Sequence, residues 1–153
     1  MIRSWKQLAL IAAAGSVLLL AGAFVFQAFG YAPCKLCHWQ RWPHGLAVLV
    51  GGAVLATGRQ RLCWFGGLAA LVTAGLGFYH TGVERGYWIG PSTCSSGGIQ
   101  GLSADDLMTQ ILAAPLVRCN EVAWSMFGLS MASWNGVLSL GLALIWVAAA
   151  RQK

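Results

Sequence analysis

Four long stretches without a charged side chain constrain this chain more than any other feature of its sequence. Aspartate, glutamate, lysine and arginine are absent from residues 7–34, 42–58, 62–83 and 122–150. An α-helix that crosses ~30 Å of hydrocarbon needs about 20 mainly apolar residues, so each stretch can hold one membrane span. The pattern predicts an all-α membrane protein, a four-transmembrane-helix bundle that forms a single integral membrane domain over residues 1–153.

We place the four spans at about 8–29, 43–58, 62–80 and 132–150. The second span is the shortest, and Pro43 leaves its upstream edge open by several residues. Proline is tolerated in the first turn of a helix but kinks a helix that begins earlier. The first stretch could instead be a cleaved signal peptide. Its apolar run continues to Phe29, longer than a typical signal core, so we expect a retained helix.

The positions of the charged residues predict the orientation in the membrane. An even number of spans puts both termini on one side, and the positive-inside rule makes that side the cytoplasm. The outer side then carries a short loop, about 30–42, and a long loop, about 81–131. The net charge of +6 lies wholly on the cytoplasmic side. Because the basic residues are scattered and form no block, the charge does not predict nucleic-acid binding.

The cysteines suggest redox chemistry on the outer side. Four of the five cysteines face that side, which is the oxidising compartment, and Cys63 lies near the inner end of the third span. Cys34 and Cys37 have the Cys-x-x-Cys spacing of redox dithiols. Cys94 and Cys119 both lie in the long loop, where a bridge between them would close a loop. Both pairs could instead be inert bridges that brace the loops of a non-enzymatic membrane protein.

Two other site types fit part of the cysteine pattern. Cys34, Cys37 and His38 match the attachment motif of a c-type haem, but a loop of a dozen residues provides little enclosure for a haem. A cysteine-rich metal site could use both pairs, but the chain lacks a second Cys-x-x-Cys. We therefore predict no metal site.

Several segments together resemble the disulfide-bond formation protein B (DsbB) family. They are CKLCHWQR at 34–41, FYHT at 78–81, GPSTC at 90–94, CNEVAW at 119–124, FGLSM at 127–131 and Trp134. The likeness covers nearly the whole chain, and its specificity comes from the combination. A vitamin K epoxide reductase-like enzyme shares the four-helix arrangement, but its Cys-x-x-Cys usually lies late in the chain, whereas here it precedes the second span.

The resemblance implies a function in the bacterial inner membrane. A protein of this family is a dithiol:quinone oxidoreductase that reoxidises a DsbA-like thioredoxin-fold protein of the periplasm and reduces ubiquinone or menaquinone. By this resemblance, Cys94 would form the mixed disulfide with the partner. Cys119 would be freed to attack Cys34 and Cys37, which we call the upper pair; Cys94 and Cys119 are the lower pair. Cys34 would exchange with Cys119, and Cys37 would face the quinone.

Two polar residues are candidates for quinone binding. Arg41 follows Cys37 by one helical turn, so in a helix its charge could stabilise a thiolate and the anion that develops on a reduced quinone. His80, at the outer end of the third span, matches a family histidine near the quinone and could assist binding or proton delivery. Both residues could instead be ordinary polar residues of the membrane interface.

Two further expectations concern packing. The run Ser103 to Asp106 resembles a capping box before a short helix in the long loop, either on the protein surface or on the membrane interface. Small residues should let helices approach closely, as bundles in lipid require. The glycines that we expect at these contacts are Gly66, Gly67, Gly75, Gly77, Gly136 and Gly141.

Overall fold

The computed structural model describes residues 4–91, 94, 105, 108, 112 and 117–152 of the chain. Four long helices account for most of these residues, which confirms the all-α class. The elements are α1 (Trp5–Ala28), α2 (Lys35–Thr57), the short 3-10 helix η1 (Gln60–Leu62), α3 (Cys63–Glu84), β1 (Ser125–Met126), β2 (Leu129–Ser130) and α5 (Met131–Arg151). The two strands form an antiparallel hairpin just before α5.

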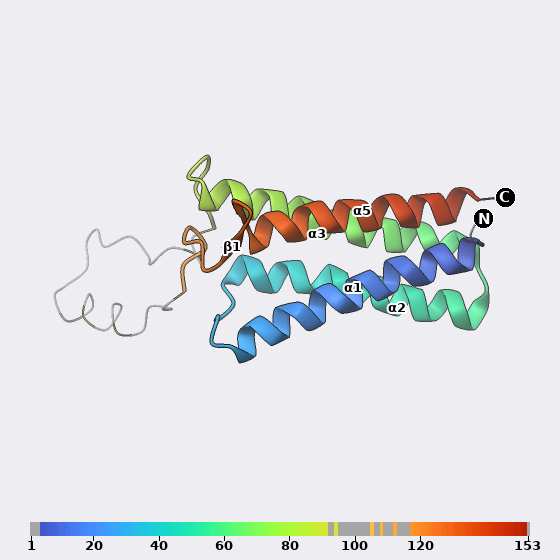
Figure 1. Cartoon of the computed structure of the whole chain (residues 1–153), viewed down its shortest axis with the longest axis horizontal. Helices are drawn as coiled ribbons and strands as arrows, with labels where there is room; N and C mark the ends of the chain where they lie inside the picture. Colours follow the sequence, from blue (N-terminus) through green and yellow to red (C-terminus); the bar gives the residue numbers. More distant parts are fainter. Residues whose placement is uncertain are drawn as a thin grey trace.

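The four long helices lie side by side along the long axis of the molecule (Figure 1). Both chain termini lie at one end of the bundle, and the β1–β2 hairpin lies at the other. The helices form a ring of neighbours, in which α3 packs on α5, α2 on α3, and α1 on both α2 and α5. The turn between α1 and α2 therefore lies at the hairpin end, together with the end of α3 and the start of α5.

Local capping explains where several helices begin and end. Ser4 and Gln7 form a reciprocal capping box at the start of α1. The Ser130 side chain accepts a hydrogen bond from the backbone N–H of Ser133 at the start of α5. Gly58 ends α2 with a φ of 64°, a left-handed conformation that glycine adopts without steric cost. These caps satisfy backbone groups that the helices leave unpaired at their ends.

The start of α2 corrects the predicted start of the second span. The helix begins at Lys35, ahead of the expected start at about 43, and Pro43 lies inside it. Cys34 is its N-cap, and the Cys34 sulfur accepts a hydrogen bond from the backbone N–H of Cys37. The turn between α1 and α2 is therefore shorter than the predicted loop at 30–42. The Cys-x-x-Cys motif occupies the first turn of a helix.

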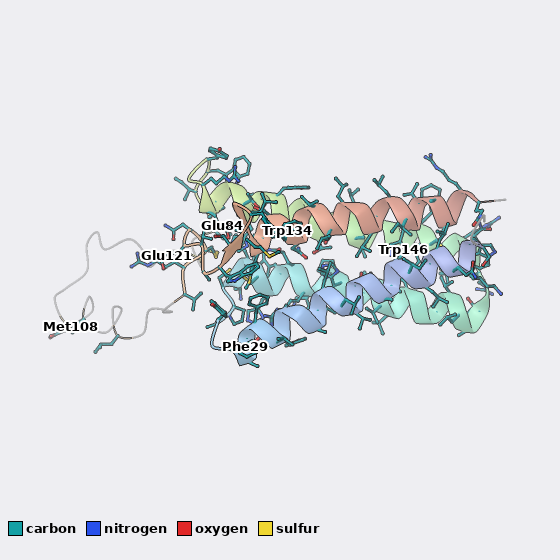
Figure 2. The ribbon with its side chains drawn as sticks, in the orientation of Figure 1. Phe29, Glu84, Met108, Glu121, Trp134 and Trp146 are labelled. Atoms are coloured by element: carbon teal, nitrogen blue, oxygen red, sulfur yellow. A yellow bond between two sulfur atoms is a disulfide. The ribbon has the colours of Figure 1, made fainter. Side chains whose placement is uncertain are left out.

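Among the described residues, three helical segments are long and apolar enough to cross a membrane: α1, the stretch Gln60–Glu84 and α5. The structure thus supports three of the four predicted spans. The N-terminal half of α2 carries too many polar residues for this helix to meet the same criterion. Its C-terminal half nevertheless shares the exposed apolar surface of the other helices. Large exposed leucines occur on all four helices, among them Leu18, Leu49, Leu68 and Leu144. Figure 2 shows side chains that project outward along the bundle. Such a surface is typical of a membrane protein.

Glycines at the helix contacts confirm part of the packing prediction. A Cβ atom at Gly66 would lie 2.6 Å from the ring of Trp146, and a Cβ at Gly77 would lie 2.7 Å from the backbone nitrogen of Gly136. Gly67 also faces α5. The prediction was wrong for Gly75 and Gly141, where a Cβ would meet nothing within 4 Å. These two glycines lie away from the close helix contacts.

Gly77→Ala is expected to destabilise the bundle. The new methyl group would meet backbone atoms of Gly136, which cannot move aside as a flexible side chain can, so α3 and α5 must separate. Overpacking of this kind costs about 1–3 kcal/mol. The matched control is Gly75→Ala on the same helix. Unfolding by titration with a denaturing detergent should show a lower midpoint for Gly77→Ala only, and equal midpoints for both variants would contradict the close α3–α5 contact.

Most of the predicted helix that follows Ser103 lies outside the described residues, so the structure does not test it. The same holds for Arg3 and Lys153 at the termini.

Candidate active site

The Cys-x-x-Cys pair lies at the hairpin end of the bundle. Both residues are free thiols, and their sulfur atoms are 2.7 Å apart. The helical geometry of the first turn of α2 brings them together, because Cys34 caps the turn and Cys37 is three residues further on. A disulfide at about 2.05 Å would need only a small further approach. The pair can therefore exist as a dithiol or as a disulfide without rearranging the helix.

The two thiols differ in acidity. A hydrogen bond from the Cys34 thiol lowers the pKa of Cys37, and the charge of Arg41 acts in the same direction, against the opposing effect of burial. The same hydrogen bond, together with burial, raises the pKa of Cys34. Cys37 is therefore the more acidic thiol of the reduced pair.

The second cysteine pair forms a disulfide next to the first. Cys94 and Cys119 are bonded, with Cα atoms 5.2 Å apart, within the usual range for a disulfide. Both are buried in one hydrophobic cluster that also contains Cys34 and Leu36. Two segments far apart in the sequence thus bring all four outer cysteines to one end of the molecule. The two pairs therefore pack in one cluster, and proximity is a condition that thiol–disulfide exchange requires.

His80 lies between the two pairs. Its Nε2 is 3.6 Å from the Cys34 sulfur, and its ring contacts the backbone of Cys119. The helix α3 continues past the predicted end of the span at 80 as far as Glu84, one turn beyond His80. The carboxylate of Glu84 is buried, accepts a hydrogen bond from Ser130, and lies 3.9 Å from His80 Nε2. His80 is therefore well placed to share a proton with the sulfur atoms.

Arg41 lies one turn after Cys37 on α2, as expected for a helix. Its guanidinium donates hydrogen bonds to the side chain of Gln27, at 2.8 Å, and to the backbone oxygen of Ala23, at 3.3 Å. It also stacks over the ring of Phe24, 4.9 Å from the centroid. These contacts on α1 hold the positive charge in one place beside the cysteines.

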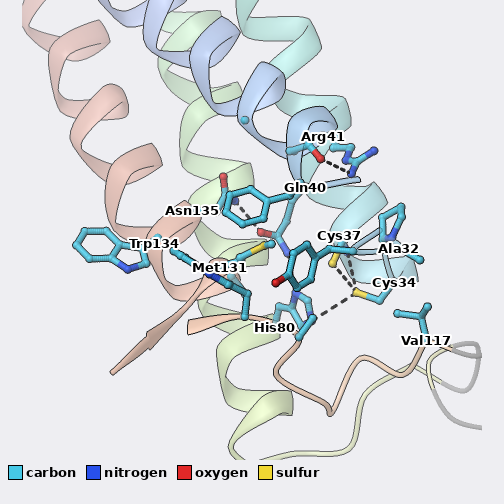
Figure 3. A pocket seen from close by; sticks show the side chains of 18 of the residues that line it. Ala32, Cys34, Cys37, Gln40, Arg41, His80, Val117, Met131, Trp134 and Asn135 are labelled. Atoms are coloured by element: carbon cyan, nitrogen blue, oxygen red, sulfur yellow. Dashed lines mark hydrogen bonds between the residues drawn. The ribbon is translucent and has the colours of Figure 1, made fainter. Parts of the chain in front are cut away.

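A pocket of about 260 Å³ joins these residues (Figure 3). Cys34, Cys37, Arg41 and His80 all line it. Its other walls come from α1, from the start of α5 and from the segment that follows Cys119. Apolar and aromatic side chains on these walls include Leu18, Leu19, Phe26, Trp124, Met131 and Trp134. The pocket offers an apolar space with a fixed cation and the more acidic of the two thiols at its edge.

Gln40 and Asn135 also line the pocket, and the sequence analysis missed them. Gln40 contacts His80, with Nε2 2.9 Å from the ring nitrogen Nδ1, and Asn135 donates to Gln40 Oε1 at 2.7 Å. A polar side chain within an apolar span is costly unless it has a partner or a function. This rule could have singled out Asn135 in the span predicted at 132–150.

The remaining candidate residues and site types have clear positions. Cys63 is fully buried in the cluster around Trp146, at the end of the bundle where the termini lie, so it is far from the other cysteines. His38 is exposed, whereas the sulfur atoms of Cys34 and Cys37 lie against the bundle. The sulfur atoms and a ring nitrogen of His80 lie within 4.8 Å of one another, a spacing that could also hold a metal ion.

Comparison with known proteins identifies the family. The model of the family "Disulfide bond formation protein DsbB" matches residues 5–149. Disulfide bond formation protein B of Verminephrobacter eiseniae is 33% identical over 170 aligned positions, which cover 97% of this chain and 90% of that protein. The protein of the same name from Albidiferax ferrireducens is 28% identical, with 90% of this chain and 85% of that protein covered.

An uncharacterized protein of Rickettsia prowazekii is 29% identical over 90% of this chain and 83% of its own length. No solved structure shows a significant match to this chain. The resemblance inferred from the cysteine segments is confirmed by the match over nearly the whole chain, and the chain belongs to the DsbB family of membrane proteins for disulfide bond formation.

Proposed function

We propose that this protein reoxidises a DsbA-like dithiol protein of the periplasm and passes the two electrons through its cysteine pairs to a membrane quinone. One observation carries the proposal. Cys34 belongs to the buried cluster that contains the Cys94–Cys119 disulfide, and together with Cys37 it also lines the pocket. It is thus the link between a disulfide that a partner could reduce and a space that could hold an electron acceptor.

The electron path follows from thiol–disulfide exchange. A partner thiolate attacks Cys94, the Cys94–Cys119 bond breaks, and the electron pair remains on Cys119. The Cys119 thiolate then attacks Cys34 of the oxidised upper pair. A Cys34–Cys119 bond forms, the Cys34–Cys37 bond breaks, and Cys37 leaves as a thiolate beside Arg41. The second thiolate of the partner attacks the partner–Cys94 bond and releases the oxidised partner. The freed Cys94 thiolate attacks Cys119, which reforms the Cys94–Cys119 disulfide and leaves Cys34 and Cys37 reduced. A bound quinone would accept two electrons and two protons from this pair and so return it to the disulfide.

The pocket suits a quinone head group by the chemistry of its walls. Leu18, Phe26 and Met131 provide apolar contact, and Arg41 provides a cation for an oxygen that gains negative charge. Leu18 is 72% exposed on the outer surface of α1, so the pocket borders a face that would meet lipid. An isoprenoid tail could therefore extend into the bilayer while the ring lies near Cys37.

The proposed topology has four spans in the bacterial inner membrane, with both termini in the cytoplasm. It is supported by the exposed apolar surface of all four helices and by the position of both termini at one end of the bundle. Lys6, Arg59, Arg61 and Arg151 belong to the segments at that end. Positive charge on one side of a bundle favours that side for the cytoplasm.

The decisive experiment is quinone reduction by the purified protein in lipid nanodiscs. A reduced DsbA-like protein serves as the electron donor, and the absorbance of a soluble ubiquinone or menaquinone analogue is followed. We expect turnover that needs both the donor and the protein. DsbA itself is a strong oxidant, with a potential of about −120 mV, so the acceptor must lie above this value. Exchange with the donor but no reduction of either quinone would contradict the proposed acceptor.

Arg41→Lys is expected to weaken quinone binding while leaving exchange with the partner intact. Lysine keeps the charge, but its single ammonium nitrogen cannot reproduce the planar arrangement in which two guanidinium nitrogens bind Gln27 and Ala23. The loss of one hydrogen bond to a charged group costs about 1.5–3 kcal/mol, so the apparent KM for quinone should rise about tenfold or more. Steady-state kinetics at varied quinone concentration provides the measurement.

The control for this substitution is Arg61→Lys, at the opposite end of the bundle, which should leave the KM for quinone unchanged. Oxidation of one equivalent of reduced partner, measured without quinone, should be equal in both variants. An equal loss in quinone reduction and in oxidation of the partner, or no loss in either reaction, would assign Arg41 to the fold or to the lipid interface.

A further inference from the structure

A continuous chain of hydrogen bonds leads from the Cys34 sulfur into the centre of the bundle. Its side chains come from α2, α3 and α5, and each is buried or partly buried in the apolar interior. The members, in order from the sulfur, are Cys34, His80, Gln40, Asn135 and His44, with Thr73 and Ser139 joined at the side. Buried polar groups in such a chain must match donors with acceptors, so each contact constrains the next.

The orientation of Gln40 follows from one backbone contact. Its side-chain nitrogen lies 3.3 Å from the carbonyl oxygen of Leu36, and a carbonyl oxygen can only accept a hydrogen bond. The atom at this position must therefore be the amide nitrogen, and the amide oxygen faces the other way. There it accepts a hydrogen bond from Asn135 Nδ2 at 2.7 Å.

Asn135 supports the same orientation from the other side. Its Nδ2 also donates to Thr73 Oγ1 at 3.2 Å, and the Thr73 hydroxyl uses its own hydrogen for the backbone oxygen of Gln40. The Asn135 oxygen lies 2.9 Å from His44 Nε2, which can donate to it. If Gln40 rotated by half a turn, two amide nitrogens would face each other, and the Leu36 carbonyl would meet an oxygen.

The position of the proton on His80 then follows. One hydrogen of Gln40 Nε2 binds Leu36, and the other points at His80 Nδ1, 2.9 Å away. Nδ1 must accept this hydrogen bond, so it carries no proton, and the neutral ring carries its hydrogen on Nε2. Nε2 is the nitrogen that faces the Cys34 sulfur at 3.6 Å and the Glu84 carboxylate at 3.9 Å. The ring also forms a hydrogen bond with the backbone of Cys119, the residue whose sulfur would attack Cys34.

We propose that Gln40 and Asn135 are positioning residues that hold His80 in its neutral Nε2–H form, with the hydrogen on the ring nitrogen that faces Cys34. The inference rests on the proposed function for its effect on rate. When the Cys119 thiolate attacks Cys34, the Cys34–Cys119 bond forms, the Cys34–Cys37 bond breaks, and the electron pair leaves on Cys37. Negative charge is shared along the three sulfur atoms during this step. A hydrogen-bond donor held at the central sulfur stabilises it.

The test is the nearly isosteric change Gln40→Glu. A carboxylate cannot donate to His80 Nδ1 but can accept from it, so the ring should change to the Nδ1–H form and leave Cys34 without a donor. Nitrogen-15 NMR of histidine-labelled protein in detergent distinguishes the two forms. The His80 signal is identified by its loss in His80→Phe. We expect Nε2–H in the native protein and Nδ1–H in Gln40→Glu.

The rate of exchange from the lower to the upper cysteine pair should fall about tenfold in Gln40→Glu, since one hydrogen bond to a charged group is lost. This step is measured in a single turnover with reduced partner and no quinone. The matched control is Gln7→Glu in the capping box of α1, where the side-chain oxygen only accepts from Ser4 N. A carboxylate can do the same there, so both the NMR signal and the rate should stay unchanged.

Asn135→Asp provides a second variant, in case Gln40→Glu does not fold. An aspartate carboxylate cannot donate to Gln40 Oε1 and instead favours the opposite orientation, while the Leu36 carbonyl still favours the native one. His80 should therefore show a mixture of both forms. Nδ1–H in the native protein would overturn the inference, as would Nε2–H retained in every folded variant. These NMR results do not depend on quinone, so they remain interpretable even if the proposed quinone reaction fails.

Discussion

Cys37→Ser is expected to abolish quinone reduction, with a loss of more than about a thousandfold, as is usual when the reactive nucleophile is removed. In the proposed path the electron pair leaves on Cys37, which lines the pocket beside Arg41, and without Cys37 the upper pair can neither form a disulfide nor deliver two electrons. The Cys94–Cys119 disulfide remains intact in the variant. One equivalent of reduced partner should therefore still be oxidised, as measured in a single turnover by trapping free thiols.

Cys63→Ser is the matched control for this experiment. Cys63 lies at the opposite end of the bundle, in a different cluster from the other four cysteines, so its replacement should leave the turnover of the folded protein near normal. Near-normal quinone reduction by Cys37→Ser would remove Cys37 from the electron path. A large loss in Cys63→Ser would show that this cysteine also takes part in the reaction.

Cys119→Ser is expected to abolish multiple turnover and to accumulate a mixed disulfide between the partner and Cys94. With the oxidised partner, the free Cys94 thiolate attacks the partner disulfide and releases one partner thiol. The thiolate that normally attacks this bond from within the chain is missing, so the adduct persists. The measurement is a non-reducing gel followed by peptide mapping of the slower band.

The double variant Cys94→Ser, Cys119→Ser serves as the control and should form no such band. An adduct that maps to Cys34 would reverse the proposed order of the two pairs. If neither Cys119→Ser nor the double variant changes the exchange with the partner, both pairs are structural bridges. The protein is then a membrane protein braced by disulfides.

The sequence predicted the helices better than it predicted their ends. Uncharged stretches placed α1 and α5 within a few residues, because a membrane span needs a minimum length of apolar sequence. The start of α2 was missed for two reasons. Pro43 resembled a first-turn proline, and the cap is a cysteine, whereas the side chains that commonly mark a helix start are serine, threonine, aspartate and asparagine.

The candidate site was predicted only in part, because spacing along the chain identifies some partners and not others. The Cys-x-x-Cys pair and the arginine one turn later have local spacings that a helix brings together. Gln40, His80 and Asn135 lie on three different helices, and no local pattern links them. Their contacts depend on how α2, α3 and α5 pack, which hydrophobic periodicity alone does not define.

The burial of the lower disulfide has a consequence for the fidelity of the reaction. Cys119 is fully buried and Cys94 is 6% exposed, so small thiols such as glutathione have little access to the bond. Since exchange rates depend on access, electrons from the thiol pool cannot easily enter the pathway. In the proposed reaction, a partner protein must first displace the side chains that cover Cys94. The same burial would slow the reduction of this disulfide by small thiols that cannot make that displacement.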